Sequence, residues 1–402
     1  MDLLSFLKYK KITAKKFAKL VGVSNVTISR YINGSRIPNK NILKKILFHT
    51  EELVTANDFH DLKKKTKSTN ELQKADKRFI KKFINKIKSG SRKYLAKSIT
   101  LIESNKIKDQ KLAEELVSQI KKNHKTIRIG ISGVPGVGKS TFIESFGLSL
   151  INKGYKVAVL AVDPSSVRTG GSILGDKTRM EKLSVEKKAF IRPSANAGHL
   201  GGVTKKTRES ILCLELAGYE FIFIETMGVG QAETEVYNMV DIFLVLLLPA
   251  GGDDLQGIKK GIIELADLLV VNKADESLSK IANITVNDYQ NALSIISSSR
   301  NGWQPKALKC SSKESTGIEK IFEEIMSFIK IMQNNGDFFE TRKKQNINWL
   351  WEMTENKINN YVKYNIKNKK YINYIKDELL KENIDVNYAS NKILTNYLKN
   401  FK

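Results

Sequence analysis

The sequence predicts an α/β fold with a mostly parallel sheet, flanked by helical extensions and preceded by a small all-α domain. Between residues 126 and 318, short apolar runs rich in β-branched residues alternate with helical stretches, which is the pattern of parallel βαβ units covered on both faces. Residues 1–50 show four short helical segments, and residues 318–402 return to helical spacing. A sheet between two helical regions is therefore expected.

The elements can be placed in order along the chain. In the first region, Gly22 suits the end of a second helix and Ser24 the start of a third. The expected strands lie near residues 127–132, 157–162, 190–191, 221–224, 242–248, 268–271 and 307–308. The resulting division is a helical domain over 1–58, a basic linker and helix over 59–92, the α/β domain with its N-terminal helices over 93–330, and a C-terminal helical arm over 331–402.

The composition argues against a membrane-spanning or secreted protein. The 402 residues are 41% hydrophobic, enough for a sizeable core, yet no apolar run reaches the roughly 18 residues of a membrane span. Asp2 stands where a signal peptide would be basic, and the two cysteines, Cys213 and Cys310, are far apart and form no CxxC motif. We expect a cytoplasmic protein that does not bind membranes.

The charge of +26 is concentrated near the N-terminus. Residues 1–125 hold 31 Lys and Arg against 11 Asp and Glu, whereas residues 126–402 hold 37 against 31. A compositional bias toward Lys, Asn and Ile would spread the excess evenly. The basic N-terminal third instead suggests a polyanionic partner, most simply nucleic acid.

A complete GxxxxGK[ST] loop follows the first expected strand and precedes a helix. Its glycines let backbone N–H groups close around phosphates, and the helix N-terminus adds a positive end. Lys139 would reach the β- and γ-phosphates, and Ser140 would bind Mg²⁺. The loop and its first helical turn comprise Gly133, Val134, Pro135, Gly136, Val137, Gly138, Lys139, Ser140 and Thr141.

Two further segments carry carboxylates at strand ends. The second strand ends at Asp163, which we expect beside the phosphate loop as a Mg²⁺ ligand through water or as a positioner of the attacking water. A glycine-rich loop over 169–172 follows, with Asp176 beyond it. Such a loop can order around a γ-phosphate and relax when that phosphate is lost, although an ordinary loop next to the site is the alternative.

The apolar strand at 221–224 ends in a DxxG-like motif in which Glu225 replaces Asp. Glu225 would act through a Mg²⁺-bound water, and the N–H of Gly228 would sense the γ-phosphate. Val229 stands where small signalling GTPases have a water-orienting Gln, so slow intrinsic hydrolysis is expected unless a partner or Gln231 completes the site. The water-orienting group stays open among Asp163, Asp176, Glu225 and the later lysines Lys259 and Lys260.

An NKxD motif follows the strand at 268–271. The carboxylate of Asp275 can accept from N1–H and the N2 amine of guanine, which adenine does not offer. Asn272 can anchor the loop and meet the base, and the stem of Lys273 can lie over its face. Ser311, Ser312 and Lys313 follow the last strand and fit a backbone contact to guanine O6. Together, these motifs predict a Mg²⁺-dependent P-loop GTPase that binds GTP and GDP.

Four longer segments resemble the MeaB/ArgK family of GTPases, which are chaperones of adenosylcobalamin-dependent acyl-CoA mutases such as methylmalonyl-CoA mutase. The segments are Ala161–Met180, Phe190–Glu209, Glu225–Glu233 and Gly252–Gly261, and Thr341–Met353 resembles the family's C-terminal arm. The resemblance implies a homodimer, a GTP cycle that gates cofactor loading and protects the mutase, and cobalamin held by the partner alone. It also implies a third switch containing Asp253, Gln256 and Lys259, with Lys260 adjacent. Met227 is a mild departure from the family pattern.

Residues 1–60 depart more strongly, because the family pattern does not include them. They resemble the helix-turn-helix of Cro/repressor-type proteins, and they carry 11 basic against 4 acidic residues. If the module binds double-stranded DNA, its third helix would enter the major groove. Candidate base contacts are Asn25, Thr27, Ser29 and Arg30; candidate phosphate contacts are Lys15, Lys16, Arg36 and Lys40. Docking of a protein is the alternative.

Three functions therefore compete. The first is the mutase-chaperone GTPase, and the second is a transcriptional regulator whose DNA affinity follows the guanine nucleotide. The third, a metal-delivery GTPase of the nickel-chaperone kind, needs clustered Cys or His ligands. The histidines are His49, His60, His124 and His199, and none pairs with a cysteine at ligand spacing, which disfavours the third function.

Overall fold

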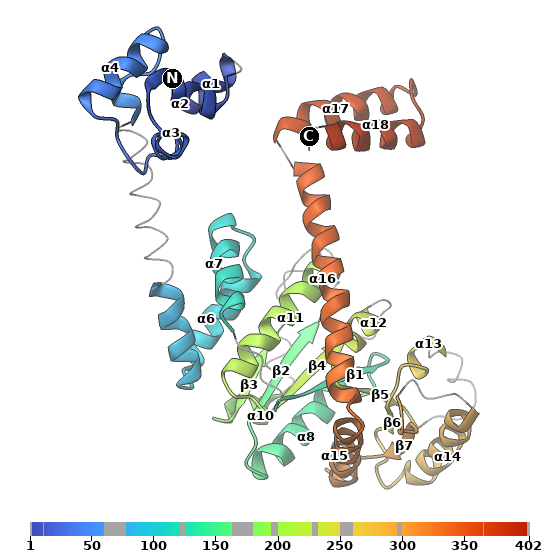
Figure 1. Cartoon of the computed structure of the whole chain (residues 1–402). Helices are drawn as coiled ribbons and strands as arrows, with labels where there is room; N and C mark the ends of the chain where they lie inside the picture. The colour runs from blue at the N-terminus through green and yellow to red at the C-terminus, as the bar shows by residue number, and fades with distance from the viewer. Residues whose placement is uncertain are drawn as a thin grey trace. The chain divides into compact units, whose positions relative to one another are not determined.

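A computed structural model of the chain resolves two compact units (Figure 1). The structure describes residues 2–10, 12–59, 78–120, 125–162, 180–193, 200–226, 232–249, 260–295, 300–364 and 366–399. One unit comprises Met1–Lys86 with Lys111–Ser118, and the other comprises Ile87–Gln110 with Gln119–Lys402. Within the described part, no helix combines the length and apolarity needed to cross a bilayer.

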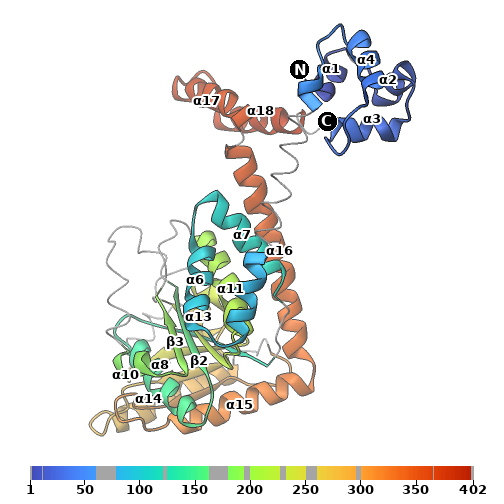
Figure 2. The same ribbon diagram turned by 90° about the vertical axis from the view of Figure 1, so that its left-hand side faces the viewer.

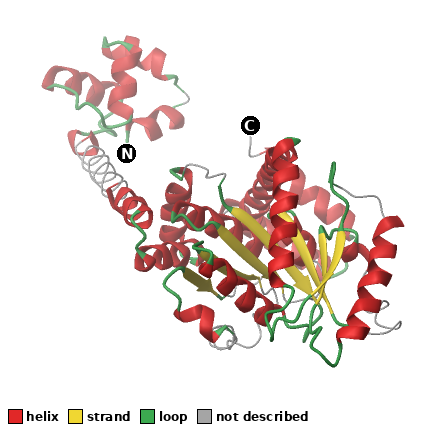
Figure 3. Ribbon diagram, turned by 90° about the horizontal axis from the view of Figure 1, so that it is seen from below, coloured by secondary structure: helices red, strands yellow, loops and turns green. Residues whose placement is uncertain are grey.

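The second unit is built on a seven-stranded sheet in the order β3-β2-β4-β1-β5-β6-β7, and every ladder in it is parallel (Figure 3). The strands are β1 Ile127–Gly133, β2 Val157–Val162, β3 Ala189–Arg192, β4 Phe221–Thr226, β5 Ile242–Leu247, β6 Leu268–Val271 and β7 Lys306–Lys309. All seven expected strands are present, and the predicted α/β class is confirmed. Strand β4 lies between β1 and β2.

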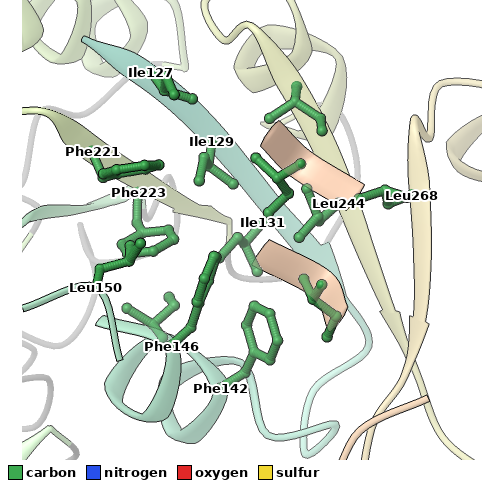
Figure 4. Packing of buried hydrophobic residues seen from close by; sticks show 14 of the residues in the cluster. Ile127, Ile129, Ile131, Phe142, Phe146, Leu150, Phe221, Phe223, Leu244 and Leu268 are labelled. Carbon is green, nitrogen blue, oxygen red and sulfur yellow. The ribbon is translucent and has the colours of Figure 1, made fainter. Parts of the chain in front are cut away.

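Helices follow most strands, and α8 and α15 cover one face of the sheet. The helices of this domain are α8 Lys139–Asn152, α10 Glu181–Val185, α11 Leu200–Leu216, α12 Ala232–Tyr237, α13 Lys260–Ile263, α14 Ser279–Ile295 and α15 Ile318–Asn334. Alternate residues of β1, Ile127, Ile129 and Ile131, pack with Phe142 and Phe146 of α8 (Figure 4). Successive side chains of a strand point to opposite faces of the sheet, so these three isoleucines all lie on the face that α8 and α15 cover.

The opposite face approaches α12 so closely that β1 needs a glycine. A Cβ on Gly130 would come within 2.7 Å of the Phe243 ring, 3.0 Å of Val240 and 3.1 Å of Val236. Real side chains do not tolerate such contacts in a close-packed interior. Gly130 therefore lets α12 lie directly on β1.

The remaining helices of this unit lie before and after the sheet. They are α6 Arg92–Glu103, α7 Ile107–Ser118 (which ends in the first unit), α16 Asp337–Tyr364, α17 Ile366–Leu380 and α18 Val386–Lys399. The last two form an antiparallel pair that lies side by side in both views (Figures 1 and 2). The 28 residues of α16 make it the longest helix described.

The first unit begins with the short helices α1 Leu3–Tyr9, α2 Ala14–Val21, α3 Asn25–Ile32 and α4 Lys40–His49. Each begins with a side-chain cap, from Asp2, Thr13, Ser24 and Asn39 in turn. Gly22 ends α2 at φ +77°, a left-handed conformation that glycine adopts at no steric cost. The cap positions expected at Gly22 and Ser24 are confirmed, and short helices gain about 1 kcal/mol from each such N-cap.

Candidate active site

The phosphate loop lies between β1 and α8, at the carboxyl end of the central strand. Gly133, Gly136 and Gly138 have φ of +149°, +81° and +93°, values that side chains rarely adopt. Gly138 is the N-cap of α8 and has no capping side chain. The backbone N–H groups of this helix start are thus available to an anion, as phosphate binding at a helix N-terminus requires.

Lys139 is the first residue of α8 and is 8% exposed. Its Nζ donates to the carbonyl oxygens of Gly133 at 2.6 Å and Val134 at 3.2 Å. The Lys139 ammonium is therefore fixed against the backbone at the start of the phosphate loop. A cation in this position is well placed for the β- and γ-phosphates.

Ser140 and Glu225 bring two oxygen ligands together from different elements. The Ser140 hydroxyl donates to Oε1 of Glu225 at 3.1 Å. Glu225 is 6% exposed, because it lies on β4 opposite Ile131 of β1 and Ala161 of β2. A hydroxyl and a buried carboxylate are hard oxygen donors of the kind that Mg²⁺ prefers, so this pair fits the metal. The motifs did not indicate a neighbouring contact between β4 and β1, in which the Thr226 hydroxyl donates to the Ser132 hydroxyl at 3.1 Å.

Asn272 connects the base-reading motif to the phosphate loop. Its Nδ2 donates to the carbonyl of Val137 at 2.8 Å, and its Oδ1 accepts from the N–H of Ser312 at 3.1 Å and from the Ser312 hydroxyl at 2.6 Å. The side chain is 1% exposed. Asn272 therefore joins its own loop to the phosphate loop and to the loop after β7. Both the nitrogen and the oxygen of its side-chain amide are hydrogen-bonded to other protein groups.

Asp275 is held by the loop that follows β7. The hydroxyl of Ser311 donates to Oδ1 of Asp275, and the same hydroxyl accepts from the N–H of Glu314 at 3.1 Å. The Asp275 carboxylate is half-buried, whereas Lys273 and Lys313 are exposed. Lys273 takes a positive φ of +57°, and its stem lies 4.0 Å from the position of a Cβ on Gly138. The two loops expected to read guanine therefore meet beside the phosphate loop.

Several expected residues lie outside the described part of the chain. These are Asp163, Asp176, Gly228, Asp253, Gln256 and Lys259, together with the loop at 169–172, Val229, Gln231 and His199. Asp163 directly follows β2, whose last residue pairs with Thr226. Lys260 begins α13. Their roles stay predictions.

Helix α16 is bound to the elements that flank the nucleotide site. Nε2 of Gln345 donates to the carbonyls of Val240 at 2.7 Å and Tyr237 at 3.5 Å, at the end of α12. Arg208 of α11 donates to the carbonyl of Gln345 at 3.2 Å and pairs with Glu352 at 3.6 Å. Arg208 is 6% exposed, and burial lowers its pKa despite the Glu352 charge. Sequence reasoning did not identify these contacts, since polar residues on a long helix resemble a solvated face.

The parallel sheet, the phosphate loop at its centre, the serine–glutamate pair and the NKxD loop define a P-loop GTPase. Residues 95–367 match the model of the family described as methylmalonyl-CoA mutase-associated GTPase MeaB. The chain belongs to this family and is a GTP-hydrolysing enzyme.

Related proteins agree with this assignment. A protein of Caulobacter vibrioides described as a GTPase is 50% identical over 275 residues, 68% of this chain and 84% of the relative. The GTPase ArgK of Escherichia coli is 46% identical over 280 residues, 69% and 85% of the two chains. The crystal structure of an LAO/AO transport system kinase is similar with a TM-score of 0.62 and 34% identity, over 80% of this chain and 97% of that one.

The first unit matches a separate family model, described as helix-turn-helix, over residues 6–47. Of the four expected base contacts, Asn25, Ser29 and Arg30 are exposed on α3, and Thr27 is half-buried with its hydroxyl 2.9 Å from that of Ser24. The prediction did not include Val26, which is 60% exposed on the same helix. The expected phosphate contacts at Lys15, Lys16, Arg36 and Lys40 are all exposed.

Proposed function

We propose that this GTPase is a chaperone that gates the loading and protection of an adenosylcobalamin-dependent acyl-CoA mutase of the methylmalonyl-CoA mutase type. The observation that carries the proposal is the attachment of α16 to α11 and to the segment that joins α12 to β5. Gln345 bonds the carbonyl of Val240, between α12 and β5, and contacts that of Tyr237, the last residue of α12, at the longer distance of 3.5 Å. Arg208 of α11 bonds α16. Since α12 follows the Glu225 motif, a change at the γ-phosphate would reach the arm through these bonds.

The chain's own residues have distinct roles in this cycle. Lys139 would neutralise phosphate charge, and the backbone N–H groups at the start of α8 would orient the phosphates. Ser140 and Glu225 would hold Mg²⁺, which supplies charge neutralisation between the β- and γ-phosphates when bound. Asp275 would select guanine. The cobalamin would be held by the mutase, without direct contact to this chain.

The test is steady-state turnover of GTP and ATP by the full-length protein with Mg²⁺, with and without purified methylmalonyl-CoA mutase. We expect slow GTP turnover that rises with the mutase, little ATP turnover, and loss of both effects in Lys139→Ala. Lys153→Ala is the matched control, because Lys153 pairs with Glu319 and lies over the Phe322 ring at the C-terminal end of α8, away from the phosphate loop. GTP turnover indifferent to the mutase would exclude this partner.

We also propose that the arm forms a homodimer. Ile347, Leu350, Trp351 and Ile358 are 55%, 60%, 61% and 47% exposed, and their spacing places them on one stripe of α16. A contiguous exposed apolar stripe is typical of an interface. Sedimentation should give a dimer for the wild type and a monomer for Trp351→Glu, whereas Lys343→Glu should stay dimeric.

DNA binding is a second candidate function, supported by the exposed face of α3. Asn25, Ser29 and Arg30 offer donors and acceptors, and Val26 offers an apolar contact of the kind that thymine methyl groups accept. Selection from a random duplex library should yield one sequence, with affinity that falls steeply with salt and changes with GTP. Arg30→Ala should abolish selection, and Lys19→Ala, on the exposed side of α2, is the control. Binding of all sequences alike would exclude a specific regulator.

A further inference from the structure

A basic hollow lies on the side of the sheet away from the GTP site. Lys156 directly precedes β2, and Lys188 directly precedes β3; both line the hollow, and Lys187 lines it as well. These positions are the amino ends of the strands, whereas the phosphate loop and the Asn272 motif follow carboxyl ends. In a parallel sheet the two ends lie on opposite edges. The hollow is therefore separate from the nucleotide site.

Among the described residues, the walls of the hollow carry four cations and no carboxylate. Arg92, Lys156, Lys187 and Lys188 line it. Arg92 is the first residue of α6, and the N-cap Ser91 makes no side-chain capping bond, so the first backbone N–H groups of α6 receive no side-chain cap beside the hollow that Ser91 and Arg92 line. The nearby Glu220 accepts from the N–H of Lys156 at 3.1 Å but does not line the hollow. All four side chains are exposed, and their combined positive charge favours an anion over a cation in the hollow.

Two contacts hold this arrangement in place. Arg92 donates to the carbonyl of Glu186 at 3.3 Å, and Lys188 donates to the carbonyl of Gly154 at 2.9 Å. Both acceptors are neutral backbone groups, so neither cation is charge-compensated by its partner. The side chains are thereby positioned without losing their charge to an ion pair.

Tyr219 also lines the hollow and adds a polar group that the protein leaves unused. Its side chain is 6% exposed and packs on Phe190, with ring centroids 6.1 Å apart. Burial raises the pKa of its hydroxyl, and the Arg92 charge opposes the rise. The hydroxyl therefore stays protonated at neutral pH. No described residue accepts its hydrogen bond, and the hydroxyl is open to the hollow, where an anion can accept from it.

We infer that this hollow is a second anion site, which binds a phosphate group carried by a small molecule and does so independently of GTP. Its volume of about 90 Å³ is several times the roughly 10–15 Å³ that admits one water, so the hollow has room for a phosphate group. The four cations supply the charge, and the α6 N–H groups and the Tyr219 hydroxyl supply directional donors.

The test is calorimetric titration of pyrophosphate into the full-length protein saturated with GDP, with Mg²⁺ in excess over both anions. We expect one further binding event that weakens with salt. Arg92→Gln and Lys187→Gln should each weaken it about fivefold, and the double variant correspondingly more. Tyr219→Phe, which keeps the ring and removes the hydroxyl, should weaken it as well.

Three comparisons make the result specific. Lys182→Gln removes an equal charge from exposed α10, which does not line the hollow, and should leave pyrophosphate binding unchanged. GDP affinity should be unchanged in all of these variants, and pyrophosphate should still bind to Lys139→Ala. Absence of a second binding event, or equal losses in Lys182→Gln, would overturn the site. If pyrophosphate fails to bind but Arg92→Gln weakens binding of duplex DNA, the hollow is a nucleic-acid contact and the small-molecule proposal is wrong.

Discussion

Arg342 of α16 forms a two-point ion pair with Asp241, the residue that precedes β5. Nε donates to Oδ1 and Nη2 to Oδ2, each at 2.7 Å, and the side chains are 6% and 1% exposed. Nη2 also donates to the carbonyl of Thr126, at the start of β1, at 2.6 Å. Burial alone would lower the pKa of Arg342, but the charge and hydrogen bonds of Asp241 outweigh burial and raise this pKa. One guanidinium therefore joins the arm to the two central strands.

Replacing Arg342 with Met should destabilise the protein strongly. The variant leaves Asp241 buried with its charge uncompensated, and loss of one member of a buried pair costs about 3–5 kcal/mol. Denaturant unfolding followed by circular dichroism measures the change in the free energy of unfolding.

Lys343→Met is the neighbouring control for this pair. Lys343 pairs with Glu340 at 2.6 Å, but the two side chains are 68% and 57% exposed. Exposed pairs of this kind contribute about 0.5 kcal/mol. Equal losses in the free energy of unfolding of the two variants would show that the Arg342–Asp241 pair stabilises the protein no more than an exposed pair does.

The Arg342–Asp241 pair also shows what the sequence could not predict. The strands and the phosphate loop were located because hydrophobic period and local glycine spacing are visible within short windows. Arg342 stands in the run Arg342-Lys343-Lys344, and nothing in that run distinguishes the buried arginine from its exposed neighbours. Its partner lies 101 residues away in sequence, so only the fold identifies the contact.

Asn272 shows the same limit inside the site. The motif correctly predicted an anchor, but whether the amide faces the base or the protein depends on where the loops after β1 and β7 meet. The order of the strands, with β4 between β1 and β2, likewise follows from how the crossovers pack, which no strand pattern encodes.

Gly138→Ala should abolish nucleotide binding and lower stability. An added Cβ would lie 2.7 Å from Nδ2 of Asn272, at a φ of +93° that disfavours any side chain. The clash would displace either the phosphate loop or the Asn272 anchor. GDP titration and thermal unfolding measure the two effects.

Gly154→Ala separates the clash from the backbone strain. Gly154 has a similar φ of +98°, but its nearest neighbour is Nζ of Lys188 at 4.0 Å. This variant should lose only the ~1–2 kcal/mol of a left-handed backbone and should bind GDP normally. If Gly138→Ala behaves identically, contact with Asn272 does not constrain the loop.

Glu225→Gln should raise the Mg²⁺ concentration needed for GTP turnover. The amide keeps the size of the side chain and can still accept from Ser140, but it removes the negative charge next to the proposed metal position. Changes in groups that act through metal-bound water typically lower metal affinity about 10- to 100-fold. Turnover measured against Mg²⁺ checks this, with the exposed Glu319→Gln as control. An unchanged Mg²⁺ dependence would remove Glu225 from the metal site.

Asp275→Asn should weaken GTP binding and admit xanthosine triphosphate. The aspartate accepts two hydrogen bonds from guanine, whereas xanthine carries a carbonyl at C2 that needs a donor, which the asparagine amide supplies. A polar mismatch of this kind changes selectivity by several powers of ten when the groups are buried. Competition binding gives the ratio. Ser311→Ala, which removes only the hydroxyl that holds Asp275, should weaken GTP binding without reversing the preference.

Cys310 should resist alkylation in the folded protein. Burial raises the pKa of its thiol to about 12; the Ser312 hydrogen bond opposes this rise, and the Asp275 charge adds to it. Only the thiolate reacts, so at pH 8 the rate should lie roughly 10³-fold below that of a free cysteine with a pKa near 8.5. The alkylation rate should rise about tenfold per pH unit from pH 8 to 10 without levelling, because the pKa of the thiol lies above this range.

Mass spectrometry after iodoacetamide treatment measures the alkylation rate of Cys310, and the same chain in urea should react at the free-cysteine rate. Rapid labelling of Cys310 in the folded chain would mean that the loop joining Asn272 to Ser312 opens freely, and Asn272 would then not anchor the phosphate loop.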